Sequence, residues 1–466
     1  MENCKFPREL LIEILVKMPI KSLMRFKCVC KYLCDLIKKD HHLKNKFYEI
    51  NRGKYDCAVI EVETAPGSSA NKLFALLHKE SECDEVRCTC VEIPDSAARY
   101  VSSCDGMLCL IFSKGGFDLR SSDFSDCCYT GDMNFNVLIW NPFIKEINAL
   151  PPVVVPNNPP TDVAITYLLY EAFGFGISNN KTWKVVMLWH FDYDPRDIEF
   201  TYEIVMVCSQ DAGDGSWRWR KIDALPNVAV EPTQDFYLKG KYYWRVHSVY
   251  GSNLPFSGER LLWFDLDSEV FGMIPLPNTG DHFSCTVMND TIALISHRCE
   301  EDSWPMDHMD IRLMSETSGD IDWPKQWRID CGGSIGKHEL LYPPAEYRTW
   351  EEEWSPVGIW NQGGRLHLLA FPDIKKYRAI GCCGTRRFSG EDNYKPYLVS
   401  VDLETQEMKL IYLAQETKCV KIVSNSSGKY VQVLSESSIE ATQLWMDTLP
   451  SCQAYARMYN PSLKLP

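Results

Sequence analysis

Long apolar runs are missing from this sequence. No stretch approaches the roughly 18 consecutive apolar residues that cross a bilayer, and the N-terminal MENCKFPREL has no apolar segment typical of a secretory signal. Helical periodicity is also scarce after residue 50, where short alternating runs dominate. These absences argue against a membrane or secreted protein, and we expect the chain in the cytoplasm or the nucleus.

The 20 cysteines lack the spacing of a metal site or a disulfide framework. Zinc ligands usually come as repeated Cys/His pairs about two to four residues apart. The close pairs here are either too near in sequence or directly adjacent: Cys28–Cys30, Cys88–Cys90, Cys127–Cys128 and Cys382–Cys383. We therefore expect reduced thiols, most of them buried, and neither a metal nor another cofactor.

Positive charge is scarce outside the first 50 residues. Those 50 residues carry 11 Lys/Arg and 6 Asp/Glu, a net charge of +5, whereas the other 416 carry 38 and 57, a net charge of −19. An acidic body disfavours nucleic acid and attracts basic partners over long range. Solubility alone is the simpler explanation of the same charge.

The N-terminal segment 1–47, called the head below, has the spacing of three short helices. Pro7 suits a first helical turn, and an apolar stripe follows it: Leu10, Leu11, Ile14, Leu15 and Met18. Pro19 would end this helix, and Ser22 would cap a second one, running through Leu23, Phe26, Val29 and Cys30. A third apolar cluster spans residues 32–37.

The head has more large apolar side chains than a core of about 40 residues can cover. Exposed contiguous apolar surface marks a binding site, so we expect part of the head to face a partner. The alternative is that the head packs only on the body of its own chain.

The run FPRELLIEILVKMPIKSLMRFKCVCKYLCDLI resembles the F-box of plant F-box proteins. The resemblance implies docking to a Skp-type adaptor and, through it, to a cullin–RING ubiquitin ligase. Two positions depart from the family pattern: Phe6 stands where Leu is usual, and Leu33 where Trp is usual. Loss of that aromatic anchor is expected to weaken adaptor binding. The adaptor contacts that the resemblance implies are Phe6, Pro7, Leu10, Leu11, Ile14, Leu15, Pro19, Leu23, Phe26, Val29 and Leu33.

The body, residues 48–450, is predicted to be an all-β propeller of about six blades, followed by a C-terminal tail at 451–466. Turn signals recur near residues 106, 180, 240, 290, 363 and 428, each followed by an alternating strand. A second strand pair follows most of them, with bends such as Asp265–Leu266 and Asp402–Leu403. About four strands per repeat is typical of a propeller. Ring closure would pair the segment after 417 with strands at 48–93; two β-sandwiches in series are the alternative.

The order CDG, IWNP, FGFGISNNKTWKVV, WFDLDSEVFGMIPLP and VSVDLETQEMKLI is similar to the F-box-associated domain of plants, and most similar to S-locus F-box and S-locus F-box-like proteins. This resemblance implies a substrate receptor in pollen self-incompatibility that recruits S-ribonucleases, which are basic, for ubiquitination. The alternative is the same ligase role with an unrelated target in defence or development.

Sequences typical of catalytic sites are few. GGSIG at 332–336 fits a hydrolase elbow around Ser334, but the prolines after it oppose the helix that this chemistry needs. FGFG at 173–176 lacks the third glycine of a dinucleotide site, and DYDPRD at 192–197 lacks the distal Glu of a calcium loop. We therefore predict a receptor that is not an enzyme; a propeller hydrolase using Ser334 is the alternative from another class.

Overall fold

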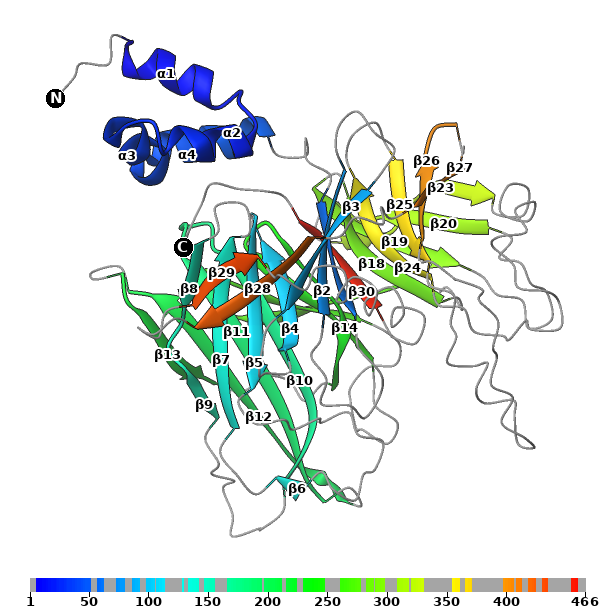
Figure 1. The fold of residues 1–466 in the computed structure, drawn as a ribbon. Helices are drawn as coiled ribbons and strands as arrows, with labels where there is room; N and C mark the ends of the chain where they lie inside the picture. Colours follow the sequence, from blue (N-terminus) through cyan, green and yellow to red (C-terminus); the bar gives the residue numbers. More distant parts are fainter. Residues whose placement is uncertain are drawn as a thin grey trace, which may run out of the picture.

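The computed structural model contains a small helical head and a large β body (Figure 1). It describes residues 6–51, 57–62, 73–79, 86–92, 98–104, 106–113, 128–129, 133–141, 146–155, 166–194, 197–211, 215–223, 229–247, 260–277, 282–288, 290–297, 308–317, 320–330, 354–360, 365–370, 397–405, 408–412, 418–424, 430–434 and 454–459.

The head has four helices, one more than the sequence predicts: α1 (Arg8–Leu15), α2 (Ile20–Phe26), α3 (Lys31–Lys39) and α4 (His41–Asn51). Pro19 separates the first two helices, as expected. It has no N–H to donate and its ring clashes with the preceding turn, so α1 cannot continue through it. However, Pro19 itself is the N-cap of α2, so Ser22 lies inside that helix rather than capping it. The second helix ends at Phe26, so the prediction that it continues through Val29 and Cys30 is wrong.

Helix α4 was missed, although the sequence carries its signal. The backbone N–H of Leu43 donates to Oδ1 of Asp40 at 2.9 Å, so Asp40 caps the helix from its N-terminal side. Leu43 and Phe47 are fully buried one turn apart. They complete the head core with side chains from the other helices, namely Ile12, Leu15, Val16, Leu23, Leu36 and Ile37.

The body contains six sheets of four or more strands in the described ranges, which we call blades 1 to 6. Blade 1 has β4 (Ala98–Cys104), β5 (Met107–Ser113), β7 (Met133–Asn141), β8 (Glu146–Ala149) and β9 (Val153–Val155). Blade 2 has β10 (Thr166–Ile177), β11 (Trp183–Asp194), β12 (Asp197–Gln210), β13 (Trp217–Ile222) and β6 (Cys128–Tyr129). Blade 3 has β14 (Ala229–Leu238), β15 (Lys241–His247), β16 (Arg260–Asp265) and β17 (Phe271–Pro275).

The remaining blades complete the body. Blade 4 has β18 (His282–Met288), β19 (Thr291–His297), β20 (His308–Leu313) and β23 (Lys325–Asp330), with a hairpin of β21 (Ser315–Thr317) and β22 (Asp320–Asp322) beside it. Blade 5 has β24 (Trp354–Trp360), β25 (Arg365–Ala370), β26 (Tyr397–Asp402) and β27 (Met408–Tyr412). Blade 6 has β1 (Cys57–Val62), β2 (Leu73–Lys79), β3 (Val86–Glu92), β28 (Lys418–Ser424), β29 (Tyr430–Leu434) and β30 (Ala454–Tyr459).

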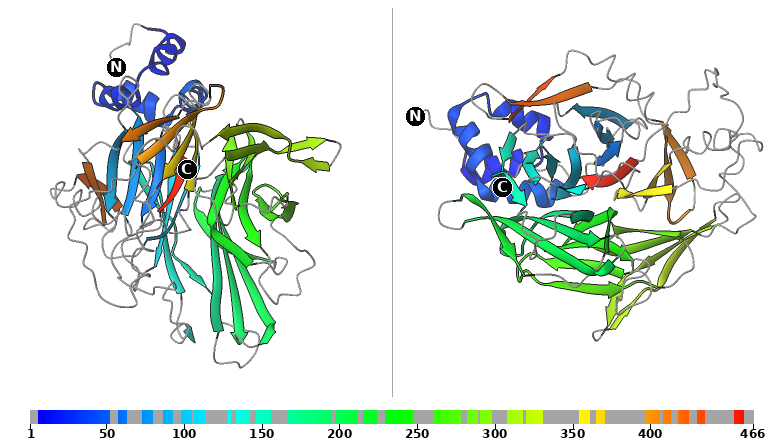
Figure 2. Two further views of the ribbon diagram at one scale, coloured as in Figure 1. Left: turned by 90° about the vertical axis from the view of Figure 1, so that its right-hand side faces the viewer. Right: turned by 90° about the horizontal axis from the view of Figure 1, so that it is seen from below.

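The blades form a closed ring. The inner strand of each blade lies next to the inner strand of the following blade, in the order β4, β10, β14, β18, β24, β30 and back to β4. Seen from below, the sheets surround the middle of the body (Figure 2). The predicted propeller is therefore confirmed, and its six blades exclude two β-sandwiches in series.

Blade 6 joins the two ends of the body. Its inner strand β30 pairs antiparallel with β1, and β28 pairs in parallel with β3, so the segment after 417 does meet the strands at 48–93. The strand β30 lies within the segment 451–466, which the sequence assigned to a tail. Sequence periodicity missed this strand because it follows no turn signal of its own.

Five of the six predicted turn positions fall between the two inner strands of a blade. At four of them the backbone has a positive φ: Gly106 at 77°, Lys181 at 64°, Gly240 at 81° and Asp290 at 58°. Tight hairpin turns favour this conformation. The fifth, near 363, lies outside the described residues but between β24 and β25. The sixth, near 428, joins β28 and β29 at the outer edge of blade 6.

Candidate functional site

The outer side of α1 carries exposed apolar side chains. Phe6, Leu10 and Ile14 follow one another at intervals of four residues and are 57%, 47% and 46% exposed. That spacing places them on one face of the helix. Pro7, the N-cap of α1, is exposed beside them.

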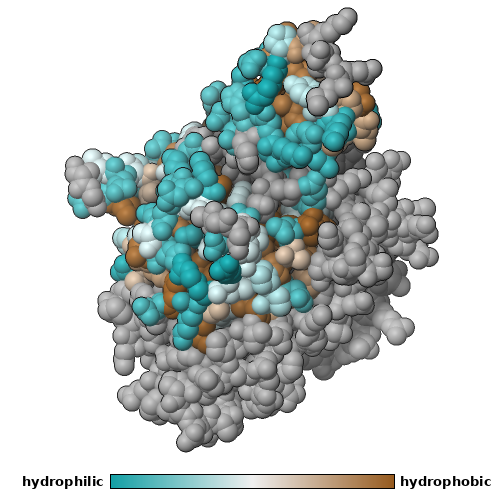
Figure 3. Space-filling view, turned by 90° about the vertical axis from the view of Figure 1, so that its left-hand side faces the viewer, coloured by the Kyte–Doolittle hydropathy of each residue, from teal (hydrophilic) through white to brown (hydrophobic). Residues whose placement is uncertain are grey.

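A second group of exposed apolar residues lies at the start of α3. Val29 is 67% exposed, and Tyr32 is exposed as well, although the sequence did not single Tyr32 out. Arg8 links α1 to the end of α3, because its guanidinium pairs with the carboxylate of Asp40, the C-cap residue of α3. We call Phe6, Pro7, Leu10, Ile14, Pro19, Val29 and Tyr32 the docking face; apolar atoms are visible on the head at the top of Figure 3.

Five of the predicted adaptor contacts do not belong to this face. Leu15 and Leu23 are fully buried in the head core. Leu11, Phe26 and Leu33 are half-buried and pack against the same core. The sequence pattern did not distinguish the exposed residues of the docking face from these five. The spacing in a short amphipathic helix shows where the apolar residues are, but not which of them the core of the head covers.

Ion pairs fix α1 against the rest of the head. Glu13 on α1 accepts a hydrogen bond from Nζ of Lys46 on α4, and this contact lowers the pKa of Glu13. Burial would raise the pKa of Asp40, but hydrogen bonds from the Leu43 backbone and the Arg8 side chain outweigh it and lower the pKa. The exposed face of α1 is therefore presented by a helix that is held at both ends.

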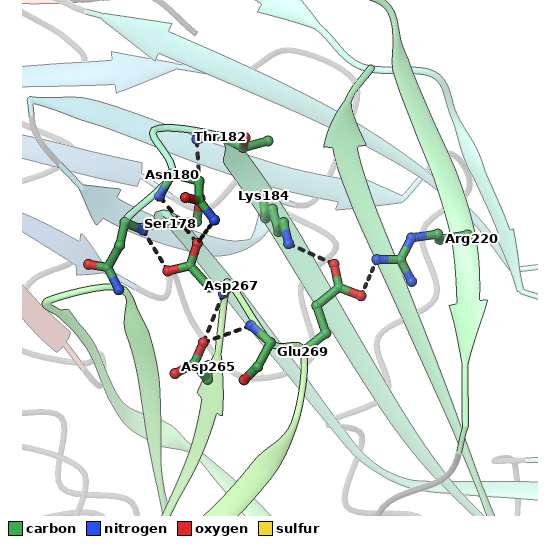
Figure 4. Close-up of polar contacts among 10 residues, drawn as sticks. Ser178, Asn180, Thr182, Lys184, Arg220, Asp265, Asp267 and Glu269 are labelled. Carbon is green, nitrogen blue, oxygen red and sulfur yellow. Dashed lines mark hydrogen bonds and ion pairs between the residues drawn. The ribbon is translucent and has the colours of Figure 1, made fainter. Parts of the chain in front are cut away.

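A second cluster of polar groups lies between blades 2 and 3 (Figure 4). The carboxylate of Asp267, in the β16–β17 turn, accepts hydrogen bonds from the backbone N–H groups of Asn179 and Asn180 at 2.8 and 3.2 Å. Glu269 in the same turn pairs with Lys184 of β11, at 2.7 Å, and with Arg220 of β13. We call Asp267, Glu269 and these partners the blade latch.

The blade latch has the properties of a structural contact. Burial would raise the pKa of Asp267 and of Glu269, but hydrogen bonds from the neighbouring blade outweigh it and lower both pKa values. Asp265 accepts hydrogen bonds from the backbone N–H groups of Asp267 and Ser268, at 2.9 and 3.0 Å, which shapes the turn. Carboxylates that are ionised and engaged in this way are poorly suited to accept a proton from a substrate.

The two regions of the chain each match a family model. Residues 4–45 match the F-box domain, and residues 126–331 match the F-box-associated β-propeller domain. The first match covers the helices that present the docking face, and the second covers the blade latch. Both domains that the sequence resemblance implies are thus matched, an F-box in the head and an F-box-associated propeller in part of the body.

Several curated proteins of Arabidopsis thaliana are similar to this chain in sequence. F-box protein At2g17830 is 26% identical over 330 residues, covering 66% of this chain and 71% of its own length. F-box/kelch-repeat protein At3g17530 is 23% identical over 306 residues, covering 63% and 67%.

Solved propeller structures align with this chain only loosely. The β-propeller domain of the Trilobed protease from Pyrococcus furiosus aligns with a TM-score of 0.33 and 12% identity, over 74% of this chain and 79% of its own. Trypanosoma rangeli sialidase aligns with a TM-score of 0.35 and 9% identity, over 83% and 61%.

The remaining sequence motifs show no reaction centre in the described ranges. The FGFG motif lies within β10, where Gly174 packs against the ring of Tyr242 and leaves no loop for a nucleotide. Cys88 and Cys90 lie on β3, and Asp192 and Asp194 on β11. Among the described residues no group of three His, Cys, Asp or Glu side chains is placed to hold a metal, and no helix has the length and apolarity to cross a membrane. Ser334 lies outside the described residues.

Proposed function

We propose that this F-box protein is the non-catalytic substrate receptor of a Skp–cullin–F-box ubiquitin ligase, and that the docking face binds the Skp-type adaptor. The observation that carries the proposal is the row of Phe6, Leu10 and Ile14, large apolar side chains left exposed on one face of α1. Burying such side chains stabilises a complex by about 1.5–3 kcal/mol each when burial is complete. The adaptor would cover apolar surface that the head cannot cover itself.

The receptor would act by proximity rather than by chemistry. The propeller holds the target while the F-box holds the adaptor, and the ligase presents charged ubiquitin to lysines of the target. Tethering of this kind raises the effective concentration of the reacting groups without a catalytic side chain in the receptor.

The target that we propose is a basic protein. Residues after the first 50 carry a net charge of −19, which steers cationic partners toward the body and disfavours nucleic acid. A non-self S-ribonuclease is the specific candidate that the S-locus resemblance suggests; a basic target in defence or development is the alternative. Expression confined to pollen, and recovery of an S-ribonuclease with the receptor from pollen extract, would support the first.

The docking face is tested by changing Leu10 and Ile14 to Asp in the full-length chain. Two buried charges at the interface should weaken adaptor binding by at least about 100-fold, since a charge desolvated without a partner costs several kcal/mol. Titration calorimetry with the purified adaptor gives the dissociation constant, and circular dichroism checks that the helices remain.

Glu9 provides the control for this experiment, because it lies on the same helix with a highly exposed side chain. The variant Glu9→Gln should bind the adaptor within about twofold of the unchanged protein. If the Leu10→Asp, Ile14→Asp protein still bound the adaptor normally, the proposed docking face would be wrong; if the unchanged protein bound no adaptor, the proposed function would be wrong.

A further inference from the structure

One ion pair links the head to the propeller. Lys27, the C-cap residue of α2, places its Nζ 3.6 Å from Oε1 of Glu146, the first residue of β8 in blade 1. The two side chains are only 15% and 35% exposed, so the pair is partly shielded from solvent. An ion pair in such a setting is screened less by salt than one between fully exposed side chains.

Lys44 on α4 adds a second positive charge to this contact. The side chain is half-buried, and burial lowers the pKa of Lys44. The negative charge of Glu146 favours the charged form of Lys44, whereas the positive charge of Lys27 disfavours that form. The carboxylate of Glu146 thus pairs with Lys27, at the end of α2, and also attracts Lys44 on α4 electrostatically.

The part of the docking face on α1 lies elsewhere on the head. Helix α1 is on the side of the head away from the sheets, whereas α2 and α4 lie nearer to them (Figures 1 and 2). The residues Phe6, Leu10 and Ile14 remain exposed while Lys27 contacts Glu146. An adaptor could therefore occupy the docking face without breaking the contact between head and propeller.

We propose that Glu146 is a positioning residue that holds the F-box in one orientation on the propeller. The inference rests on the proposed function, because that orientation sets where the adaptor extends relative to a bound target. Effective concentration falls when the linkage between two bound partners is loose or wrongly directed. Glu146 would thus affect ubiquitin transfer without touching either partner.

The contact also gives the unequal charge of the chain a physical role. The first 50 residues, of net charge +5, and the other 416, of net charge −19, attract each other. This attraction is non-specific, but the ion pair between Glu146 and Lys27 gives it one location. Attraction of Lys44 by the same carboxylate adds to the preference for this docked arrangement.

The first test measures the distance between head and propeller in the full-length chain. Fluorophores are attached through unnatural amino acids at Asn45 on α4 and Lys181 in the β10–β11 turn, both exposed; the 20 cysteines rule out selective thiol labelling. The variant Glu146→Lys should broaden the distance distribution, and the triple variant Glu146→Lys, Lys27→Glu, Lys44→Glu should narrow it again. Lys38→Glu, an exposed charge reversal on α3, serves as the control and should leave it unchanged.

The second test measures ubiquitin transfer in the reconstituted ligase. Glu146→Lys should slow transfer to a bound target by about threefold or more, with the dissociation constants for adaptor and target unchanged, and the triple variant should restore the rate. The proposal would be overturned if Glu146→Lys left the distance distribution unchanged. It would also be overturned if the triple variant did not restore the rate of ubiquitin transfer. The distance measurement needs no adaptor and no target, so its outcome is separate from the proposed function itself.

Discussion

The carboxylate of Asp310 on β20 binds two cationic side chains of β23. It accepts hydrogen bonds from Nε and Nη2 of Arg328 at 2.8 and 3.0 Å and lies 2.5 Å from Nζ of Lys325. Burial alone would raise the pKa of Asp310, but hydrogen bonds from these two side chains outweigh it and lower the pKa to about 2. The interaction fixes the outer strand pair of blade 4.

This lowered pKa predicts a pH dependence of stability. Because the folded-state pKa lies below the usual 3.8, the contribution of Asp310 is present above about pH 4 and lost as the pH falls toward 2, by about 2 kcal/mol in all. Asp310→Asn should lower the free energy of unfolding by about 1–2 kcal/mol at pH 7. Urea unfolding between pH 7 and pH 3 measures both.

The variant Glu316→Gln provides a comparison, since the side chain of Glu316 is exposed on β21. Glu316→Gln should leave stability and its pH dependence nearly unchanged. If Asp310→Asn lost stability with falling pH as steeply as the unchanged protein, another group would be responsible for the acid sensitivity.

Leu33 is half-buried against the head core, at the position where plant F-boxes usually carry Trp. An indole there would extend beyond the space that the leucine fills and add aromatic surface for the adaptor. We expect Leu33→Trp to strengthen adaptor binding by about three- to tenfold, since an aromatic contact adds roughly 0.5–1.5 kcal/mol. Surface plasmon resonance with immobilised adaptor measures this change; Leu33→Met, which keeps the volume, should leave affinity unchanged.

At the scale of elements, the seam between blades 2 and 3 is closely packed around Gly176 on β10. A Cβ atom at this position would overlap the ring of Tyr237 and approach Cδ1 of Leu266 to 2.7 Å. The hydroxyl of Tyr237 donates to the carbonyl oxygen of Ile177 at 2.7 Å, so its ring has little freedom to move. The glycine is required by the neighbouring blade rather than by the backbone conformation of its own strand.

We therefore predict that Gly176→Ala destabilises the protein by about 1–3 kcal/mol, the usual cost of overpacking. Differential scanning calorimetry should show a lower Tm. At Gly215, by contrast, nothing lies within 4 Å of a Cβ atom, so Gly215→Ala causes no overpacking. Any lowering of Tm in that variant would come from backbone strain, because the φ of Gly215 is 69°. A Gly176→Ala protein with unchanged Tm would show that the seam adapts.

Sequence periodicity predicted most strands but only part of the head. Turn signals worked because Gly106, Gly240 and Asp290 occupy turns whose positive φ only certain residues adopt readily. In the head, the pattern could not tell the exposed Leu10 from the buried Leu15, since both are leucines on a helix of eight residues. Glu146 had no local signal at all, because its partner is more than 100 residues away in the chain.

At the scale of the whole molecule, the ring depends on one strand near the C-terminus. Residues 454–459 of β30 pair with residues 57–62 of β1 and close the contact between blades 5 and 1. Without β30, the edge of β1 would lose its partner and the ring its sixth inner strand. Unpaired strand edges also promote aggregation.

We expect a chain that ends at residue 450 to lose most of the roughly 5–15 kcal/mol that stabilises a typical domain. A synthetic peptide of residues 452–461 should restore part of the loss by adding the missing strand, whereas a peptide with Ala456→Pro, which cannot donate a hydrogen bond at that position, should not. Thermal unfolding with and without peptide decides between these outcomes. Unchanged stability of the shortened chain would contradict the role of β30 in closure.

The closure of blade 6 also determines the order in which the protein becomes functional during synthesis. The head has a hydrophobic core of its own and is complete once Asn51 has been made, whereas the ring waits for β30, some 400 residues later. At about 5–20 residues per second, that interval is on the order of 20–80 s. Under the proposed function, nascent chains expose a finished docking face well before the ring that would hold a target is complete. Prematurely terminated chains would occupy adaptor without delivering a target, so truncating alleles are expected to act as dominant inhibitors of other receptors that share the adaptor.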